Sequence, residues 1–165
     1  CPGTNGCSAF TTTYGTASST QSFSVSGSNL TANLIATAPT GYEVSSDGTS
    51  YGSTCSFAQT SGSASGTLRV RLAATATVSG AYDSKNIVLS STGATDANIT
   101  TASSGNSVSA KGLTITGLTA SNKTYNGTTA VTVNGTAAYS GLVNSQSFTP
   151  GDVVTWAFAD ANVGS

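Results

Sequence analysis

Short runs in which apolar and polar residues alternate occur along most of the chain. The clearest run spans residues 67–72, in which three aliphatic residues alternate with Arg69 and Arg71. Because successive side chains of a strand point to opposite faces, we expect the aliphatic residues to face a core and both arginines to face solvent. Similar runs lie at residues 23–25, 33–38, 42–44, 55–57 and 87–89 and around Ile99.

Glycines separate these runs at short intervals, at positions 27, 41, 48, 52, 62, 66, 80 and 93. This spacing is typical of antiparallel strands that are joined by tight turns. Roughly seven to eight strands can be counted before Ser109. Residues 1–108 are therefore predicted to form a β-sandwich.

A second series of alternating runs follows, at residues 113–115, 131–133 and 154–158. About four strands are too few for an ordinary sandwich, and a small sheet needs a second layer to bury its apolar face. Residues 109–165 are therefore predicted to form a smaller or incomplete β-domain. The missing layer could come from the first domain, from residues beyond Ser165 or from a neighbouring molecule.

Hydroxyl groups, rather than charges, give the chain its polarity, because 57 of 165 residues are Ser or Thr and only 11 are charged. Thr suits the pleated surface of a sheet, and Ser and Gly suit turns. The five cations, Arg69, Arg71, Lys85, Lys111 and Lys123, are scattered, so a nucleic-acid partner is not expected. Apolar runs of about 18 residues are absent from the sequence, so a transmembrane helix is not expected either.

Three cysteines are an odd number, and an exported protein is expected to pair two of them. Cys7 with Cys55 is the favoured pair, because Cys55 alternates with Phe57 in a strand and Cys7 precedes the first strand. The alternative is Cys1 with Cys7, closed around a turn-rich sequence. In the favoured pairing Cys1 is left over and could form an intermolecular disulfide. A lipid-modified Cys1 is disfavoured, because Pro2 is an unusual neighbour for such a residue.

The residues that commonly carry enzymatic chemistry are scarce. The chain has no His, which excludes His-dependent nucleophiles and the commonest zinc sites. The single Glu, Glu43, is expected to be a solvated charge on a strand rather than half of a catalytic carboxylate pair. Asp152 and Asp160 are expected to form turns rather than a calcium site. We therefore predict no catalytic residues, no metal and no cofactor.

Exposed aromatic rings could still bind carbohydrate on a flat sheet face. Tyr14, Tyr51, Tyr139 and Trp156 are the candidates. Trp156, however, alternates with Val154 and Phe158. This pattern favours an apolar stripe in a core or an interface, formed by Val154, Trp156 and Phe158.

Two segments resemble known families. Residues 8–108 resemble an immunoglobulin-like repeat of large bacterial surface proteins, particularly those of Bacteroidetes, in the stretches at 21–30, 38–45 and 68–73. The segment from Leu113 onward is similar to the YDG repeat of bacterial adhesins, in the stretches at 113–118, 123–129 and 158–164. The Asp that gives this repeat its name is replaced here by Asn126, which removes a charge but still suits a turn before Gly127.

Together the resemblances imply an immunoglobulin-like antiparallel sandwich followed by a partial YDG-like repeat. They also imply a non-enzymatic structural or adhesive protein of the extracellular surface, commonly built from tandem repeats. Because the second module looks incomplete, we expect self-association by strand complementation, with Val154, Trp156 and Phe158 at the interface. A carbohydrate-binding adhesin module is the alternative, and a passive spacer is a third.

Overall fold

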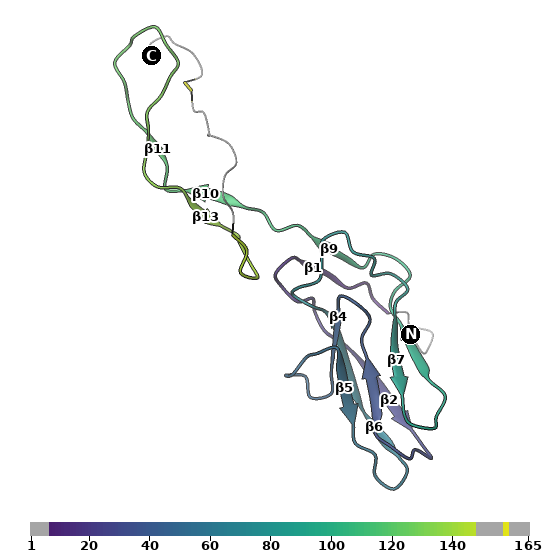
Figure 1. The fold of residues 1–165 in the computed structure, drawn as a ribbon. Coiled ribbons are helices and arrows are strands. Elements are labelled where there is room, and N and C mark those ends of the chain that lie inside the picture. The colour runs from purple at the N-terminus through teal and green to yellow at the C-terminus, as the bar shows by residue number, and fades with distance from the viewer. Residues whose placement is uncertain (1–6, 148–156, 159–165) are drawn as a thin grey trace. The chain divides into compact units, whose positions relative to one another are not determined.

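The chain folds into two units, Cys1–Lys111 and Gly112–Ser165, in a computed structural model that describes residues 7–147 and 157–158. Figure 1 shows the course of the chain. The elements found in the described residues are all β-strands, so the predicted all-β class is confirmed. The division falls three residues after the sequence-based boundary at residue 108.

Unit 1 contains two antiparallel sheets. The first has the order β2-β6-β4, formed by Gln21–Gly27, Ala64–Leu72 and Tyr42–Ser45. The second has the order β5-β3-β7-β8, formed by Thr54–Phe57, Leu34–Thr37, Asn86–Ser90 and Ala97–Thr100. Figure 1 labels β2, β4, β5, β6 and β7.

A single hydrophobic core joins the two sheets. The first sheet contributes Val25, Tyr42, Val44, Leu68, Val70 and Leu72, and the second contributes Leu34, Ala36, Phe57, Ile87 and Ile99. The three aliphatic residues of the 67–72 run are completely buried, as their alternation predicted. Unit 1 is therefore a β-sandwich, and the two arginines of β6 lie on its outer face.

The strand order of the sandwich matches the immunoglobulin arrangement, with one addition. Six strands can be matched in chain order to the immunoglobulin strands B to G: β2, β3, β4, β6, β7 and β8. The sheet β2-β6-β4 then corresponds to B-E-D, and the strands β3-β7-β8 correspond to C-F-G. β5 is the extra strand and pairs with β3 at one edge. The chain thus crosses between the sheets at each step from β2 to β7, so most consecutive strands lie in different sheets of the predicted sandwich.

Tyr82 closes the connection between β6 and β7. Its buried hydroxyl donates to the Thr77 carbonyl over 2.6 Å, and the Tyr42 hydroxyl donates to the Tyr82 carbonyl over 2.9 Å. A Tyr just before strand F that bonds to backbone a few residues upstream is the tyrosine corner of immunoglobulin-type sandwiches. Burial also raises the pKa of Tyr42 to about 12, so the Tyr42 hydroxyl remains a donor at neutral pH.

The ends of unit 1 lie side by side. β1 (Thr11–Thr13) pairs with β9 (Ser107–Ser109) in parallel, whereas the other strand pairs of the described residues are antiparallel. β1 is the first described strand, and β9 is the last strand before unit 2.

Unit 2 is built on a long antiparallel hairpin. β10 (Thr114–Thr116) pairs with β13 (Ala138–Ser140), and β11 (Thr119–Ala120) pairs with β12 (Val133–Asn134). Between these pairs the register shifts by one residue, so the return strand contains a bulge. Gly117 and Gly135 occupy the bulge with φ of 81° and 97°, and the opposite backbone leaves no room for a Cβ at either position.

We predict that Tyr82→Phe lowers the free energy of unfolding by about 1 kcal/mol, because the bond to the Thr77 carbonyl is lost while the ring packing remains. Urea unfolding measures the change. Tyr14→Phe is the matched control, since Tyr14 also packs against the core. It should change stability by less than about 0.5 kcal/mol. If both variants lose the same free energy of unfolding, the Tyr82 hydroxyl does not stabilise the fold as a tyrosine corner.

Candidate functional site

The described part of unit 2 has no buried residue. Four of its large apolar side chains remain open to solvent: Leu113 is 52% exposed, Ile115 50%, Tyr125 61% and Phe158 38%. In the described part of unit 1, Val78 is the only large apolar side chain in this exposed class, at 41%. Unit 2 therefore presents apolar surface that a stable fold normally covers.

Part of this surface lies on one face of the hairpin. Leu113 and Ile115 are two residues apart, so they project from the same face. Tyr139 on β13 lies directly opposite Ile115 and shares that face. We call Leu113, Ile115 and Tyr139 the apolar face of the hairpin. The predicted strand at 113–115 is thus confirmed as β10, whereas the predicted strand at 131–133 is reduced to β12, which begins at Val133.

The strands of this hairpin lack the residues that usually shield an open edge. None of the residues in β10, β11, β12 and β13 is charged, and none is Pro. Natural proteins usually shield open strand edges with charged residues, Pro or a covering segment. β10 pairs only with β13 among the described strands, so the other side of β10 is an open edge there.

The predicted apolar stripe is described only at Phe158. Val154 and Trp156 lie outside the described residues. The Phe158 backbone N–H donates to the Thr129 carbonyl over 2.9 Å, and the Lys123 ammonium lies 5.8 Å from the centre of the Phe158 ring. Phe158 is thus attached beside the tip of the hairpin and remains exposed.

Asn126 performs the turn function expected at the position of the YDG aspartate. Its Oδ1 accepts hydrogen bonds from the Lys123 Nζ over 2.9 Å, the Thr128 Oγ1 over 2.8 Å and the Thr128 backbone N–H over 3.2 Å. An amide oxygen and a carboxylate oxygen can both accept these bonds. The replacement of Asp by Asn therefore leaves this turn intact.

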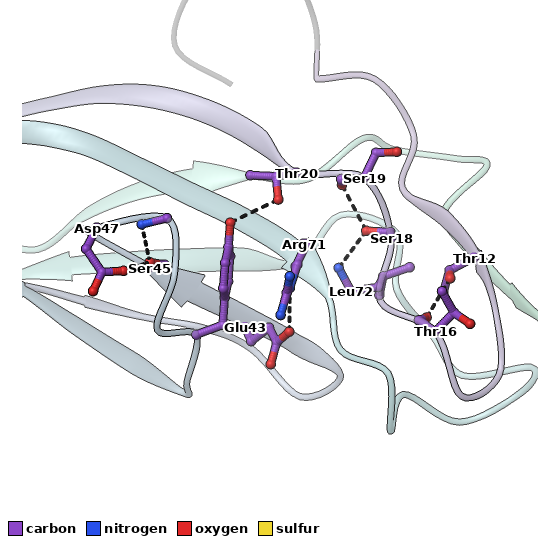
Figure 2. Close-up of polar contacts among 12 residues, drawn as sticks. Thr12, Thr16, Ser18, Ser19, Thr20, Glu43, Ser45, Asp47, Arg71 and Leu72 are labelled. Carbon is purple, nitrogen blue, oxygen red and sulfur yellow. Dashed lines mark hydrogen bonds and ion pairs between the residues drawn. The ribbon is translucent and has the colours of Figure 1, made fainter. Parts of the chain in front are cut away.

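A second surface feature lies on the outer face of the β2-β6-β4 sheet. The Arg71 guanidinium stacks 3.6 Å from the centre of the Tyr51 ring, and its Nε donates to the Glu43 Oε1 over 2.6 Å. The Tyr51 hydroxyl lies 3.0 Å from the Thr20 Oγ1. Figure 2 shows Thr20, Glu43 and Arg71 in this cluster. The expectation that Glu43 is a solvated charge is wrong, because it is partly buried and paired with Arg71.

The loop that follows β4 holds Tyr51 in this place. The Asp47 carboxylate accepts from the backbone N–H groups of Ser50 and Thr49 and from the Ser45 hydroxyl, at 2.7–2.9 Å. These bonds, chiefly those from Ser50 and Thr49, lower the pKa of Asp47 well below its ordinary value. Figure 2 shows Asp47 beside Ser45. Both Glu43 and Asp47 therefore have structural partners, and together they position an aromatic ring on a polar surface.

The other aromatic candidates for sugar binding are placed differently. Tyr14 packs against the core of unit 1, and Tyr139 belongs to the apolar face of the hairpin. Trp156 lies outside the described residues. Alternation alone did not predict the stacking on Tyr51, because its partner Arg71 is 20 residues away in the sequence.

The favoured disulfide between Cys7 and Cys55 is wrong, because Cys55 has a free thiol. The Cys7 Sγ lies 3.2 Å from the Thr100 carbonyl at the β8 edge of the four-stranded sheet, whereas Cys55 is in β5 at the opposite edge. Three strand spacings of about 4.8 Å separate these edges, roughly 14 Å, and a disulfide requires Cα atoms within about 7 Å. Cys1, the cysteine of the alternative pair and the candidate for an intermolecular disulfide, lies outside the described residues.

Groups of three or more His, Cys, Asp or Glu side chains that could hold a metal ion do not occur in the part of the chain that the structure describes. Helices long and apolar enough to cross a membrane do not occur there either.

Comparison with known proteins identifies the second segment. The model of the YDG domain family matches residues 109–165, which are the residues whose sequence resembled the YDG repeat. Neither a curated protein nor a solved structure matches the chain. The chain thus contains a YDG domain in its last third, and that domain carries the exposed apolar face.

We predict that Cys55 reacts slowly with iodoacetamide in the native protein, because burial raises the pKa of its thiol and leaves less thiolate at a given pH. The rate should increase at least tenfold in denaturing urea, and mass spectrometry without reduction should find Cys55 alkylated. A peptide that links Cys7 to Cys55 would contradict this result.

Proposed function

We propose that this protein is a non-enzymatic structural or adhesive component of an extracellular surface, and that its second unit associates with further copies by strand addition. One observation carries the proposal: the exposed side chains of Leu113 and Ile115 lie on β10 and beside it, and β10 has no charged residue and one edge that is open among the described strands. A two-stranded hairpin is marginally stable in water by itself. An added strand would supply the missing backbone partners.

Strand addition accounts for the two exposed features together. A strand placed along β10 would accept and donate the backbone hydrogen bonds that the edge leaves open, and its side chains could cover Leu113 and Ile115. Burying the exposed half of each side chain contributes about 1 kcal/mol. A contact in which one surface of a copy meets a different surface of the next does not close, so it generates filaments.

The adhesin context rests on three supporting observations. The match to the YDG domain covers residues 109–165. The strand order of unit 1, apart from the added β5, is compatible with the immunoglobulin-like sandwich that the resemblance implies. The hydroxyl-rich composition with only 11 charged residues suits an extracellular protein. We propose an assembly of tandem or self-associating repeats on this basis.

We predict that Ile115→Thr weakens self-association of the full chain at least tenfold, because the substitution removes apolar surface from the docking face while Thr retains strand propensity. Light scattering after size-exclusion chromatography measures the association, and electron microscopy reports filaments. Val78→Thr is the matched control, since Val78 is a similarly exposed aliphatic residue of unit 1.

The control variant should associate as the unmodified chain does. Circular dichroism of both variants checks that the strand content is unchanged. A chain that stays monomeric at high concentration, with unit 2 well ordered, would overturn the proposed assembly. Equal effects of the two substitutions would show that the hairpin face is not the docking surface.

Carbohydrate binding is the second candidate function, and the fixed Tyr51 ring favours it. Sugars pack on aromatic faces, and neighbouring polar groups orient their hydroxyls. Arg71 stacks on one face of the ring and pairs with Glu43, so a sugar would use the opposite face, and the bond to Thr20 limits the rotation of the ring. This site is on unit 1, so it is independent of assembly through unit 2.

We predict that, if this second function is present, Tyr51→Ala abolishes binding to a glycan array, because the stacking surface is lost. Tyr125→Ala is the control, since Tyr125 is the more exposed ring but belongs to the hairpin of unit 2. Binding that survives Tyr51→Ala, or an array without any bound glycan, would exclude this site as a sugar platform.

A further inference from the structure

β1 and β9 are the strands through which the chain enters and leaves unit 1, and they pair with each other in parallel. Thr11, Thr12 and Thr13 pair with Ser107, Val108 and Ser109. The Ser107 N–H donates to the Phe10 carbonyl at one end, and the Tyr14 N–H donates to the Ser109 carbonyl at the other, both over 2.9 Å. The ladder therefore extends beyond the two strands on the β1 side.

Both strands are fastened to the sandwich by buried residues. Val108 and Phe10 are buried, and the Phe10 ring meets Tyr42 edge to face at a centre-to-centre distance of 5.4 Å. The Phe10 N–H also donates to the Oδ1 of the buried Asn106 over 2.9 Å. Asn106 in turn donates from its Nδ2 to the Asp83 carboxylate over 2.6 Å.

We propose that β1 and β9 form a clamp that keeps unit 1 folded when the chain is under tension. Tension pulls β1 backward from its Phe10 end and pulls β9 forward from its Ser109 end. Because the strands are parallel, these forces oppose each other along the strand axis and shear the ladder. All of its hydrogen bonds are then loaded at the same time.

The position of the clamp shields the remainder of the sandwich. Residues 15–106 lie between the two clamped strands in the sequence, so tension along the chain reaches them only after β1 and β9 have separated. In an antiparallel hairpin pulled from its open end, by contrast, the bonds break one after another. Resistance to forced unfolding is set by the unfolding rate, which such a clamp lowers. Load-bearing is a function of unit 1 and holds whether or not unit 2 assembles.

Two valines allow a matched test. Val108 on β9 and Val25 on β2 are each 5% exposed, and Val25 lies on a strand that pairs only with β6 in the described residues. The full chain is held by its two ends in optical tweezers at constant force. The unit 1 event is recognised by a length gain of roughly 30 nm, the extended length of about 100 residues less their folded span.

Val108→Ala is expected to increase the unfolding rate of unit 1 under load about tenfold, whereas Val25→Ala increases it less than threefold. Their urea midpoints should fall by similar amounts, because the same buried side chain is shortened in each. If the two variants unfold equally fast under load, or if Val108→Ala unfolds no faster than the unmodified chain, the clamp is refuted.

Thr12→Pro provides a second test that leaves the core unchanged. The bonds made by Phe10 and Tyr14 place Thr12 at the next bonding position of the parallel ladder, and proline removes the backbone donor there. The variant should unfold at least tenfold faster under load. Its unfolding at an unchanged rate would overturn the proposal, even if Val108→Ala failed to fold.

Discussion

The burial of one face of β6, the central strand of the three-stranded sheet, is the interaction on which unit 1 depends. β6 pairs with β2 on one side and with β4 on the other, and its three aliphatic side chains are completely buried. Arg69 and Arg71 point the opposite way, to the outer face. There the Arg71 guanidinium stacks on the Tyr51 ring, and the Arg69 Nη1 donates a hydrogen bond to the Ser46 carbonyl over 3.3 Å. The alternation of a single strand therefore organises both the core and the polar surface above it.

Unit 2 has no such central strand among its described residues. Its hairpin has the same alternation, with Leu113 and Ile115 on one face, but the described residues include no opposing sheet. Without a second layer the apolar side chains stay exposed, and the hairpin relies on local geometry. The Gly117 and Gly135 bulge and the Lys123 turn supply that geometry. Neither of them replaces the free energy that burial contributes in unit 1.

Alternation predicted where strands form much better than it predicted which strands pair. The runs around Val25, Val44 and Ile87 became β2, β4 and β7, because a period of two residues is a local property. Pairing depends on contacts between distant residues, so the insertion of β5 at the sheet edge was not predicted. The same limitation explains the wrong cysteine pair: Cys55 does point toward the core, but the sequence does not show that Cys7 lies at the other edge of the sheet.

The polar positions that organise the fold left weaker signals. Tyr82 follows Gly80 just before a strand, a spacing that could have indicated a tyrosine corner. Asn106 and Asp83 had no such signal, because their pairing links two loops 23 residues apart. In the second unit, the resemblance to a YDG repeat correctly located the domain, and the family match covers the same residues.

The two turns held by side-chain oxygens differ in how they respond to acid. The Asp47 turn depends on a carboxylate whose pKa is lowered by folding, so its stabilisation is present above the ordinary value of about 3.9 and is lost as the pH falls through the lowered value. Asn126 has no proton to gain in this range, and its amide oxygen keeps its bonds. The substitution of Asn for Asp thus makes the turn of the second unit indifferent to acidification, whereas the loop that positions Tyr51 loosens.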